Sequence, residues 1–380
     1  MNAGPISTIS NDVINDLNYT ASGLVPDRGQ EESFPLASKA VLTILLVIVI
    51  VIGCVGNYVV CLIVYKNPAM RSAINILLAN MALTDILISA VCMLPAIIML
   101  FSENKIIENI PCRIFAFLQE TFMSTGIFTL LAISIDRFRI IVKRRDKLTI
   151  AHAKILTVLS WGLSILLTFP PLIGWGKYTF YPGHSQCIYE LHNNSFQLIY
   201  LILKTCFVNF FPIFSMGFSY VCIINKVRKD ALRIRNCPEL DSRVSVTISN
   251  GKLGLPIIHR KKNSHIDIHF KTRSFKTILI LFIALTICWT PYGINIIISN
   301  ITGSYECIRN TILVWIGFVK CAINPIIYFM YISKFREAFE EHIPTSFKLS
   351  MKFSIFTKRR INPAAVYMYS NKSDRTGGNK

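Results

Sequence analysis

Long runs of apolar residues are the feature that most constrains the fold of this chain. The runs from Val41 to Val64 and from Thr277 to Ile298 contain no charged residue. Each can cross a bilayer as a helix, which takes roughly 20 residues for about 30 Å of hydrocarbon. A helix is the expected structure, because no water in the bilayer core can satisfy the backbone hydrogen bonds. Only 16% of the residues are charged, against about a quarter in soluble domains. The sequence therefore predicts an integral membrane protein.

Hydropathy and turn signals divide the chain into seven expected spans. They lie at residues 39–65, 73–101, 112–142, 152–175, 197–226, 274–299 and 309–332. The other expected segments are an N-terminus at 1–38, a third intracellular loop at 227–273, an amphipathic helix at 333–345 and a tail at 346–380. The predicted fold class is an all-α membrane protein: a seven-transmembrane helix bundle of residues 39–332 with a short amphipathic eighth helix.

The distribution of charge gives the expected orientation. The net charge of +19 would also suit a nucleic-acid-binding protein, but Lys and Arg gather in three segments on one side of the bundle. These are residues 139–147, residues 226–276 and the tail after Lys334. Basic loops face the cytoplasm. We therefore expect a multi-pass protein of the plasma membrane with an extracellular N-terminus, and no nucleic acid partner.

Three Asn-x-Ser/Thr triplets lie on the expected outer side, beginning at Asn18, Asn193 and Asn300. The first two are the predicted glycosylation sites. A similar triplet at Asn371 lies on the expected inner side, where it would not be modified. The triplet alone is thus a weak signal.

Polar and proline residues inside the predicted spans are candidates for function, because they are costly in lipid. Every span carries at least one. In chain order they are Asn57, Asp85, Asp136-Arg137-Phe138, Trp161, Pro212 with Tyr220, Cys288-Trp289-Thr290-Pro291 and Asn324-Pro325-Ile326-Ile327-Tyr328. One such motif is more often packing or a kink. All seven, in order, resemble the signatures of rhodopsin-like G-protein-coupled receptors.

This resemblance implies a receptor and not an enzyme. Its expected partners are a heterotrimeric G protein, the lipid bilayer, arrestin and receptor kinases, and it needs no cofactor or metal. The implied activation switch consists of Asp136, Arg137, Tyr220, Trp289, Pro291, Asn324, Pro325 and Tyr328. At rest Arg137 would pair with Asp136, and in the active state it would face the G protein. The two prolines remove helical hydrogen bonds and permit the inner helix halves to swing.

Two departures from the family pattern concern activation. Many relatives carry an acidic residue at the inner end of the sixth span, where this chain has Lys271. They also carry a Phe one turn below Trp289, where this chain has Leu285. Without the acidic partner, we expect a shallow barrier to activation and measurable signalling without ligand.

Lys320 is a third departure, in an expected intramembrane polar site with Asn57 and Asp85. It lies one helical turn before Asn324, where relatives have a small polar residue beside a sodium ion. Gly126 replaces another sodium ligand and leaves room. The hypothesis is that the Lys320 ammonium takes the place of sodium; the alternative is that Lys320 is neutral or turned elsewhere.

The resemblance also implies a disulfide between Cys112 and Cys187, and a ligand pocket. A biogenic amine ligand is disfavoured, because amine receptors have Asp in place of Gln119. The neighbouring Glu120 points about 100° away on a helix. The expected pocket residues are Gln119, Glu120, Met123, Trp289, Tyr292 and Asn295. An opsin is disfavoured, because the retinal-bearing position holds Phe318.

Three cytoplasmic segments, residues 133–148, 270–282 and 357–367, resemble a small brain-expressed orphan branch with proposed lysophospholipid ligands. The main lysophospholipid receptors have Arg followed by Gln or Glu where this chain has Phe115 and Ala116, so the lipid stays a hypothesis. A short peptide ligand and a largely constitutive receptor remain alternatives. A transporter is disfavoured, since the sequence has neither repeated halves nor a conduction path.

Overall fold

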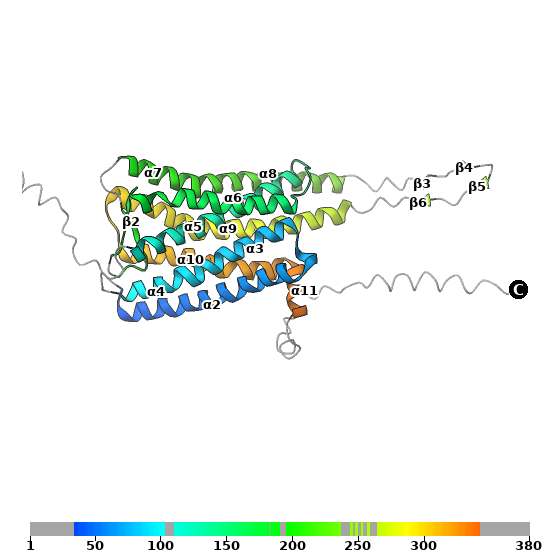
Figure 1. Cartoon of the computed structure of the whole chain (residues 1–380). Coiled ribbons are helices and arrows are strands. Elements are labelled where there is room, and N and C mark those ends of the chain that lie inside the picture. Colours follow the sequence, from blue (N-terminus) through cyan, green and yellow to red (C-terminus); the bar gives the residue numbers. More distant parts are fainter. Residues whose placement is uncertain are drawn as a thin grey trace, which may run out of the picture. The chain divides into compact units, whose positions relative to one another are not determined.

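A computed structural model gives the arrangement of the chain. It describes residues 34–102, 110–181, 183–190, 195–236 and 264–342, together with four two-residue strands between residues 244 and 258. In the described part, seven helical segments are long and apolar enough to cross a membrane. They lie side by side in Figure 1, so the predicted seven-helix bundle is confirmed.

The first four spans are built as follows. The first is α2 (Leu36–Lys66), and a 3₁₀ turn (Pro68–Met70) leads out of it. The second is α3 (Ala73–Leu87), a π-helical turn (Ile88–Cys92) and α4 (Met93–Phe101). The third is α5 (Ile110–Ile141), and the fourth is α6 (Ile150–Thr168) with a 3₁₀ turn (Pro170–Ile173).

The fifth span is α7 (Ser195–Thr205), a second π-helical turn (Cys206–Phe210) and α8 (Phe211–Asn236). The sixth is α9 (Ser264–Thr302), and the seventh is α10 (Cys307–Tyr331). The predicted eighth helix is present as α11 (Ser333–His342). Its Phe335 is buried and stacks on Tyr328 with ring centroids 6.0 Å apart.

Local sequence explains where several helices begin and end. Ser72 and Thr149 cap α3 and α6, because their side chains accept hydrogen bonds from the backbone N–H groups of Asn75 and His152. Helix α6 ends at Thr168, earlier than the predicted residue 175. The reason is that the Pro170-Pro171 pair lacks the N–H groups that a longer helix needs.

The helices flanking the predicted third intracellular loop are longer than predicted. The loop was expected at residues 227–273, but α8 continues to Asn236 and α9 begins at Ser264. Helical hydrogen bonding is cooperative, so a helix already formed in the membrane extends into a polar segment at little cost. Two strand pairs lie between them, Val244–Ser245 with Ile257–Ile258 and Ile248–Ser249 with Lys252–Leu253. The predicted eighth helix extended to residue 345, and residues 343–345 lie outside the described ones.

The bundle buries polar residues inside and shows apolar ones outside. Asn57, Asp85 and Asn324 have no exposed surface, whereas Phe214 and Leu166 are 75% and 70% exposed. In water such exposed apolar surface would be unfavourable. Lipid is the solvent that suits it, and the interior is left for polar contacts.

A β-hairpin lies at the end of the bundle where α4 ends and α7 begins (Figure 1). Strand β1 (Lys177–Thr179) pairs antiparallel with β2 (Ile188–Glu190), with Tyr178 opposite Tyr189. A disulfide joins Cys112 of α5 to Cys187 beside β2, as predicted. These residues belong to a buried cluster, so the hairpin is fixed to the bundle.

Candidate functional site

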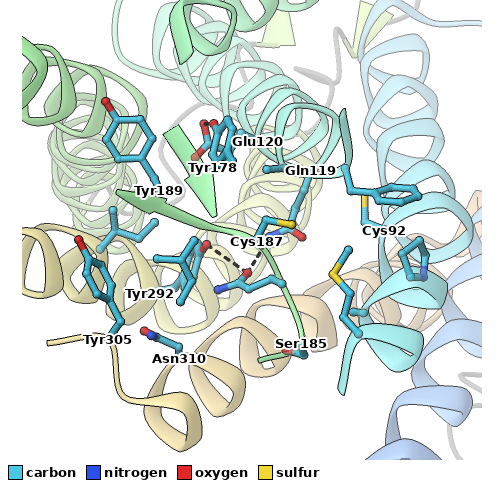
Figure 2. Close-up of a pocket in the computed structure, with 18 of the residues that line it drawn as sticks. Cys92, Gln119, Glu120, Tyr178, Ser185, Cys187, Tyr189, Tyr292, Tyr305 and Asn310 are labelled. Carbon is cyan, nitrogen blue, oxygen red and sulfur yellow. Dashed lines mark hydrogen bonds between the residues drawn. The ribbon is translucent and has the colours of Figure 1, made fainter. Parts of the chain in front are cut away.

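A cavity lies between the hairpin and the neighbouring helix ends (Figure 2). It holds about 640 Å³ of space between atoms, counting the part that is open to solvent. Residues from α4, α5, α9 and α10 line it together with the hairpin. The predicted pocket residues Gln119, Glu120 and Tyr292 are among them, which makes this cavity the candidate ligand site.

Gln186, just before the disulfide, reaches into this cavity from the hairpin segment. Its side-chain oxygen accepts hydrogen bonds from Gln119 Nε2 and from the Tyr292 hydroxyl, both at 3.2 Å (Figure 2). The preceding Ser185 is fully buried, and its hydroxyl accepts a hydrogen bond from Trp315 Nε1 at 3.1 Å. The loop is thus bonded to the third, sixth and seventh spans.

A second cavity lies deeper, between α5, the fifth span and α9. It holds about 430 Å³ counted in the same way, and Met123, Val208 and Ile296 contribute apolar lining. Glu120 and Tyr292 line both cavities. The two therefore adjoin at these two side chains.

An ion pair stands where the cavities adjoin. Lys204 Nζ of α7 lies 2.8 Å from Glu120 Oε2 of α5, and both side chains are nearly buried. The Tyr178 hydroxyl donates a second hydrogen bond to the same oxygen at 3.0 Å. Burial raises the pKa of Tyr178 well above its ordinary value, and the negative charge of the neighbouring Glu120 carboxylate adds a smaller increase. The phenol therefore stays protonated and keeps donating to the carboxylate.

Two predicted pocket residues, Trp289 and Asn295, line neither of these two cavities. Trp289 lies beneath the cavities and packs edge-on against Tyr292 and Phe318, with centroids 5.9 and 6.2 Å apart. Asn295 turns toward α10, because Asn310 accepts a hydrogen bond from its amide. Met123 does line the deeper cavity.

A second polar centre lies in the middle of the bundle. Lys320 Nζ is 2.7 Å from Asp85 Oδ1, and Asn324 donates to Asp85 Oδ2 at 2.6 Å. The lysine is only 3% exposed. A Cβ atom added to Gly126 would lie 3.6 Å from the ammonium, so the glycine leaves it room. The ammonium therefore fills the space in front of the carboxylate.

Asn57 supports this centre from the first span. Its amide donates to the backbone oxygens of Gly53 and Cys321, at 2.8 and 2.9 Å. Cys321 directly follows Lys320, so this hydrogen bond ties α2 to α10 at the level of the lysine. The three residues of the expected intramembrane polar site thus lie in one neighbourhood.

Four of the implied switch residues, Asp136, Arg137, Tyr220 and Tyr328, lie toward the helix ends that are farther from the hairpin. Arg137 Nη2 is 3.3 Å from Asp136 Oδ2, while the Leu148 N–H donates to the other carboxylate oxygen at 3.2 Å. The hydroxyls of Tyr220 and Ser134 are hydrogen-bonded at 3.0 Å. Tyr328 is fully buried against Phe335. The structure thus brings Asp136 and Arg137 together. It places Tyr220 beside Ser134 and Tyr328 beside Phe335.

Residues 56–328 match the family model described as 7 transmembrane receptor (rhodopsin family). The chain belongs to this family of G-protein-coupled receptors. It is 37% identical, over 88% of its length and 91% of the other protein, to the high-affinity lysophosphatidic acid receptor of Xenopus laevis. It is 36% identical, over 88% of its length and 90% of the other protein, to the probable G-protein coupled receptor 45 of Homo sapiens.

The solved structure of squid rhodopsin is also similar to this receptor, with a TM-score of 0.69 and 20% identity. The similarity covers 92% of the receptor and 94% of the squid protein. At that identity it bears on the fold alone. It agrees with the seven membrane-spanning helices of the receptor.

Three residues of the receptor's site were missed from the sequence: Tyr178, Gln186 and Lys204. Lys204 gave a signal, because it is the single charged residue between positions 196 and 225. A charge inside a span is a functional candidate by default. Tyr178 and Gln186 carried no comparable sequence signal, because a loop sequence does not indicate which side chains turn toward the cavity.

The predicted glycosylation sites Asn18 and Asn193 lie outside the described residues of the receptor. The same holds for the side chain of Lys271, where relatives have an acidic residue. These assignments remain predictions.

Proposed function

We propose that this receptor lies in the plasma membrane with its N-terminus outside, binds a lysophospholipid and activates a heterotrimeric G protein. The observation that carries the ligand class is the 37% identity, over most of both chains, to a high-affinity lysophosphatidic acid receptor. The two adjoining cavities suit such a ligand. The charged pair offers a place for a headgroup, and the apolar lining of the deeper cavity suits an acyl chain.

The proposed signal passes through Tyr292 to Trp289. The two rings are in edge contact, so a ligand that moves the tyrosine also displaces the indole. Gly317 allows α10 to approach closely, because an added Cβ would lie 2.8 Å from the Trp289 ring. Pro291, two residues farther along α9, supplies the bend that lets the inner half of this helix move.

At the inner side, the proposed switch is the release of Arg137 from Asp136. Outward movement of α9 opens a cleft in which Arg137 meets the G protein. Tyr220 and Tyr328 then turn from their present neighbours, Ser134 and Phe335, toward the arginine. Arrestin and receptor kinases are proposed as further partners of this inner face.

A largely constitutive receptor is the second candidate. Gln186 already occupies the outer cavity and bonds Gln119 and Tyr292, so part of the ligand's place is filled by the receptor itself. Lys271, which stands where many relatives have an acidic residue, also favours signalling without a ligand.

Nucleotide exchange on purified G protein tests the proposal. The receptor is reconstituted in nanodiscs and titrated with lysophospholipids and with short peptides, with Arg137→Gln as the inactive control. We expect a lysophospholipid to increase exchange above the ligand-free rate. A peptide that acts where every lipid fails would overturn the ligand class, and high exchange that no ligand raises would favour the constitutive receptor.

A further inference from the structure

The charges that face the two cavities balance. Among the described residues that line them, Glu120 and Lys204 are the only charged ones. Their side chains are 13% and 9% exposed, and 2.8 Å separates the nitrogen from the oxygen. A ligand therefore meets one negative and one positive group side by side, with no net charge.

The surroundings of this pair hold both charges in place. Tyr178 donates to the carboxylate, and the rings of Tyr189 and Tyr200 lie 5.2 and 5.6 Å from the ammonium. Aromatic faces attract cations of either source, a lysine or a ligand. The carboxylate and the ammonium thus each have further partners besides one another.

A ligand of one charge fits this site poorly. A phosphomonoester carries about −1.5 to −2 near neutral pH. If it bound Lys204, it would break the ion pair and leave the Glu120 carboxylate buried beside another anion. Separating a buried pair by satisfying only one partner is strongly unfavourable. A ligand with only an ammonium group is unfavourable for the corresponding reason. If it paired with Glu120, the buried Lys204 ammonium would lose its partner.

We propose that the site selects a lysophospholipid with a zwitterionic headgroup, in which a phosphodiester meets Lys204 and an ammonium meets Glu120. Such a headgroup inserts between the two side chains and pairs both at once. The rings of Tyr189 and Tyr200 remain beside the Lys204 ammonium. This inference rests on the proposed function, since it names the headgroup of the lipid that the receptor binds.

Two lipids that differ only in the headgroup test the inference. Oleoyl lysophosphatidylethanolamine is zwitterionic, and oleoyl lysophosphatidic acid is a phosphomonoester with the same chain. Each is titrated against the full-length receptor in nanodiscs of diacyl phosphatidylcholine, with G-protein nucleotide exchange and receptor melting temperature as readouts. We expect the zwitterionic lipid to act at a concentration at least about tenfold lower.

The two single variants of the pair should affect the lipids differently. In Glu120→Gln the anionic neighbour is gone, so the phosphomonoester should gain potency and the zwitterion should lose it. In Lys204→Gln both lipids should lose potency, because both phosphates lose their cation. The control is Glu306→Gln, which breaks an exposed ion pair with Arg309 and should leave the preference unchanged.

Either single variant leaves one buried charge without its partner, which by itself can prevent folding. The double variant E120Q with K204Q removes both charges and keeps similar shapes, so it carries the test in that case. We expect its preference between the two lipids to fall to about equal potency, within roughly threefold.

Three results would overturn the inference. If the wild type responds to both lipids and prefers the phosphomonoester or neither, the headgroup is wrong and the proposed function stands. If the zwitterionic preference survives in the double variant, the ion pair does not make the choice. If no lysophospholipid changes exchange or melting temperature, the proposed ligand class falls, and the inference falls with it.

Discussion

Lys320 carries the most consequential single charge inside the bundle. Its ammonium contacts Asp85 at 2.7 Å, at the place where relatives are expected to hold sodium. A second cation beside the first would be repelled, so the lysine excludes the ion by occupying its site. The resting state would then be held by a covalent part of the chain and not by a dissolved ion.

Sodium titration checks this hypothesis. Replacing sodium with choline in the buffer should leave ligand-stimulated exchange of the wild type unchanged. In Lys320→Ser the carboxylate is freed and a small hydroxyl is added, so sodium should now lower basal exchange. A wild type that responds clearly to sodium, with the response lost in Asp85→Asn, would show that the lysine does not fill the site.

Stability gives an independent measurement of the same pair. Asp85→Asn leaves a buried ammonium without its carboxylate, which should cost about 3–5 kcal/mol and lower the melting temperature. Adding Lys320→Met should restore most of that loss, since neither charge then remains. Equal melting temperatures for the single and the double variant would show that the two residues do not interact.

The two ion pairs differ in how far sequence predicts them. Lys320 lies four residues before Asn324 on one helix, so helical spacing and the family's sodium site together pointed to Asp85. Glu120 and Lys204 lie on different spans with no motif around them. Their meeting depends on how the fifth span is rotated, and the π-helical turn at Cys206–Phe210 changes that rotation.

Among the structural elements, the hairpin segment before Cys187 fills part of the first cavity, the one that it lines together with α4, α5, α9 and α10. Its Gln186 must give up two hydrogen bonds before a headgroup can reach Tyr292. Each neutral hydrogen bond contributes about 0.5–1.5 kcal/mol. Removing this side chain should therefore help an incoming ligand.

Gln186→Ala should lower the lipid concentration for half-maximal exchange by roughly fivefold to a hundredfold, as expected for two released hydrogen bonds. The matched control is Thr179→Ala on strand β1, which removes a hydrogen bond to Glu190 outside the cavity. Dose–response curves of the two variants give the answer. A weaker response in Gln186→Ala would mean that the glutamine contacts the ligand directly.

Helix α2 approaches α10 closely at Gly56. A Cβ added there would lie 2.7 Å from Pro325 Cγ, whereas one added to Gly162 on α6 meets nothing within 4 Å. Overpacking of this kind costs about 1–3 kcal/mol. We expect Gly56→Ala to lower the melting temperature and surface expression, with Gly162→Ala unaffected. Equal losses in both variants would remove the packing explanation.

For the whole molecule, hydropathy predicted seven helices because a bilayer leaves the backbone no other choice. The ends of helices were predicted less well, because prolines and cooperative extension decide them locally. Asn295 shows a third limit. A polar residue on the outer part of a span was assigned to the ligand, but a neighbouring helix supplied its partner, Asn310.

The orientation in the membrane is also a property of the whole chain. With basic loops inside, Asn18 and Asn193 face the lumen during synthesis and should receive glycans. Treatment with peptide-N-glycosidase should shorten the receptor on a gel, and Asn18→Gln with Asn193→Gln should abolish that change. An N-terminal tag that antibodies reach only in permeabilised cells would contradict the orientation.

The π-helical turns, Ile88–Cys92 and Cys206–Phe210, interrupt the α-helices of the second and fifth spans. An insertion or deletion of one residue outside such a turn re-aims every outer side chain, while the turn absorbs the change before it reaches the inner half. In the fifth span this would move Lys204 and leave Tyr220 where it is. Receptors with such turns can change their ligand specificity by one-residue insertions or deletions while their coupling to the G protein stays unchanged. The same turns are suitable junctions for chimeras that join the outer half of one receptor to the inner half of another.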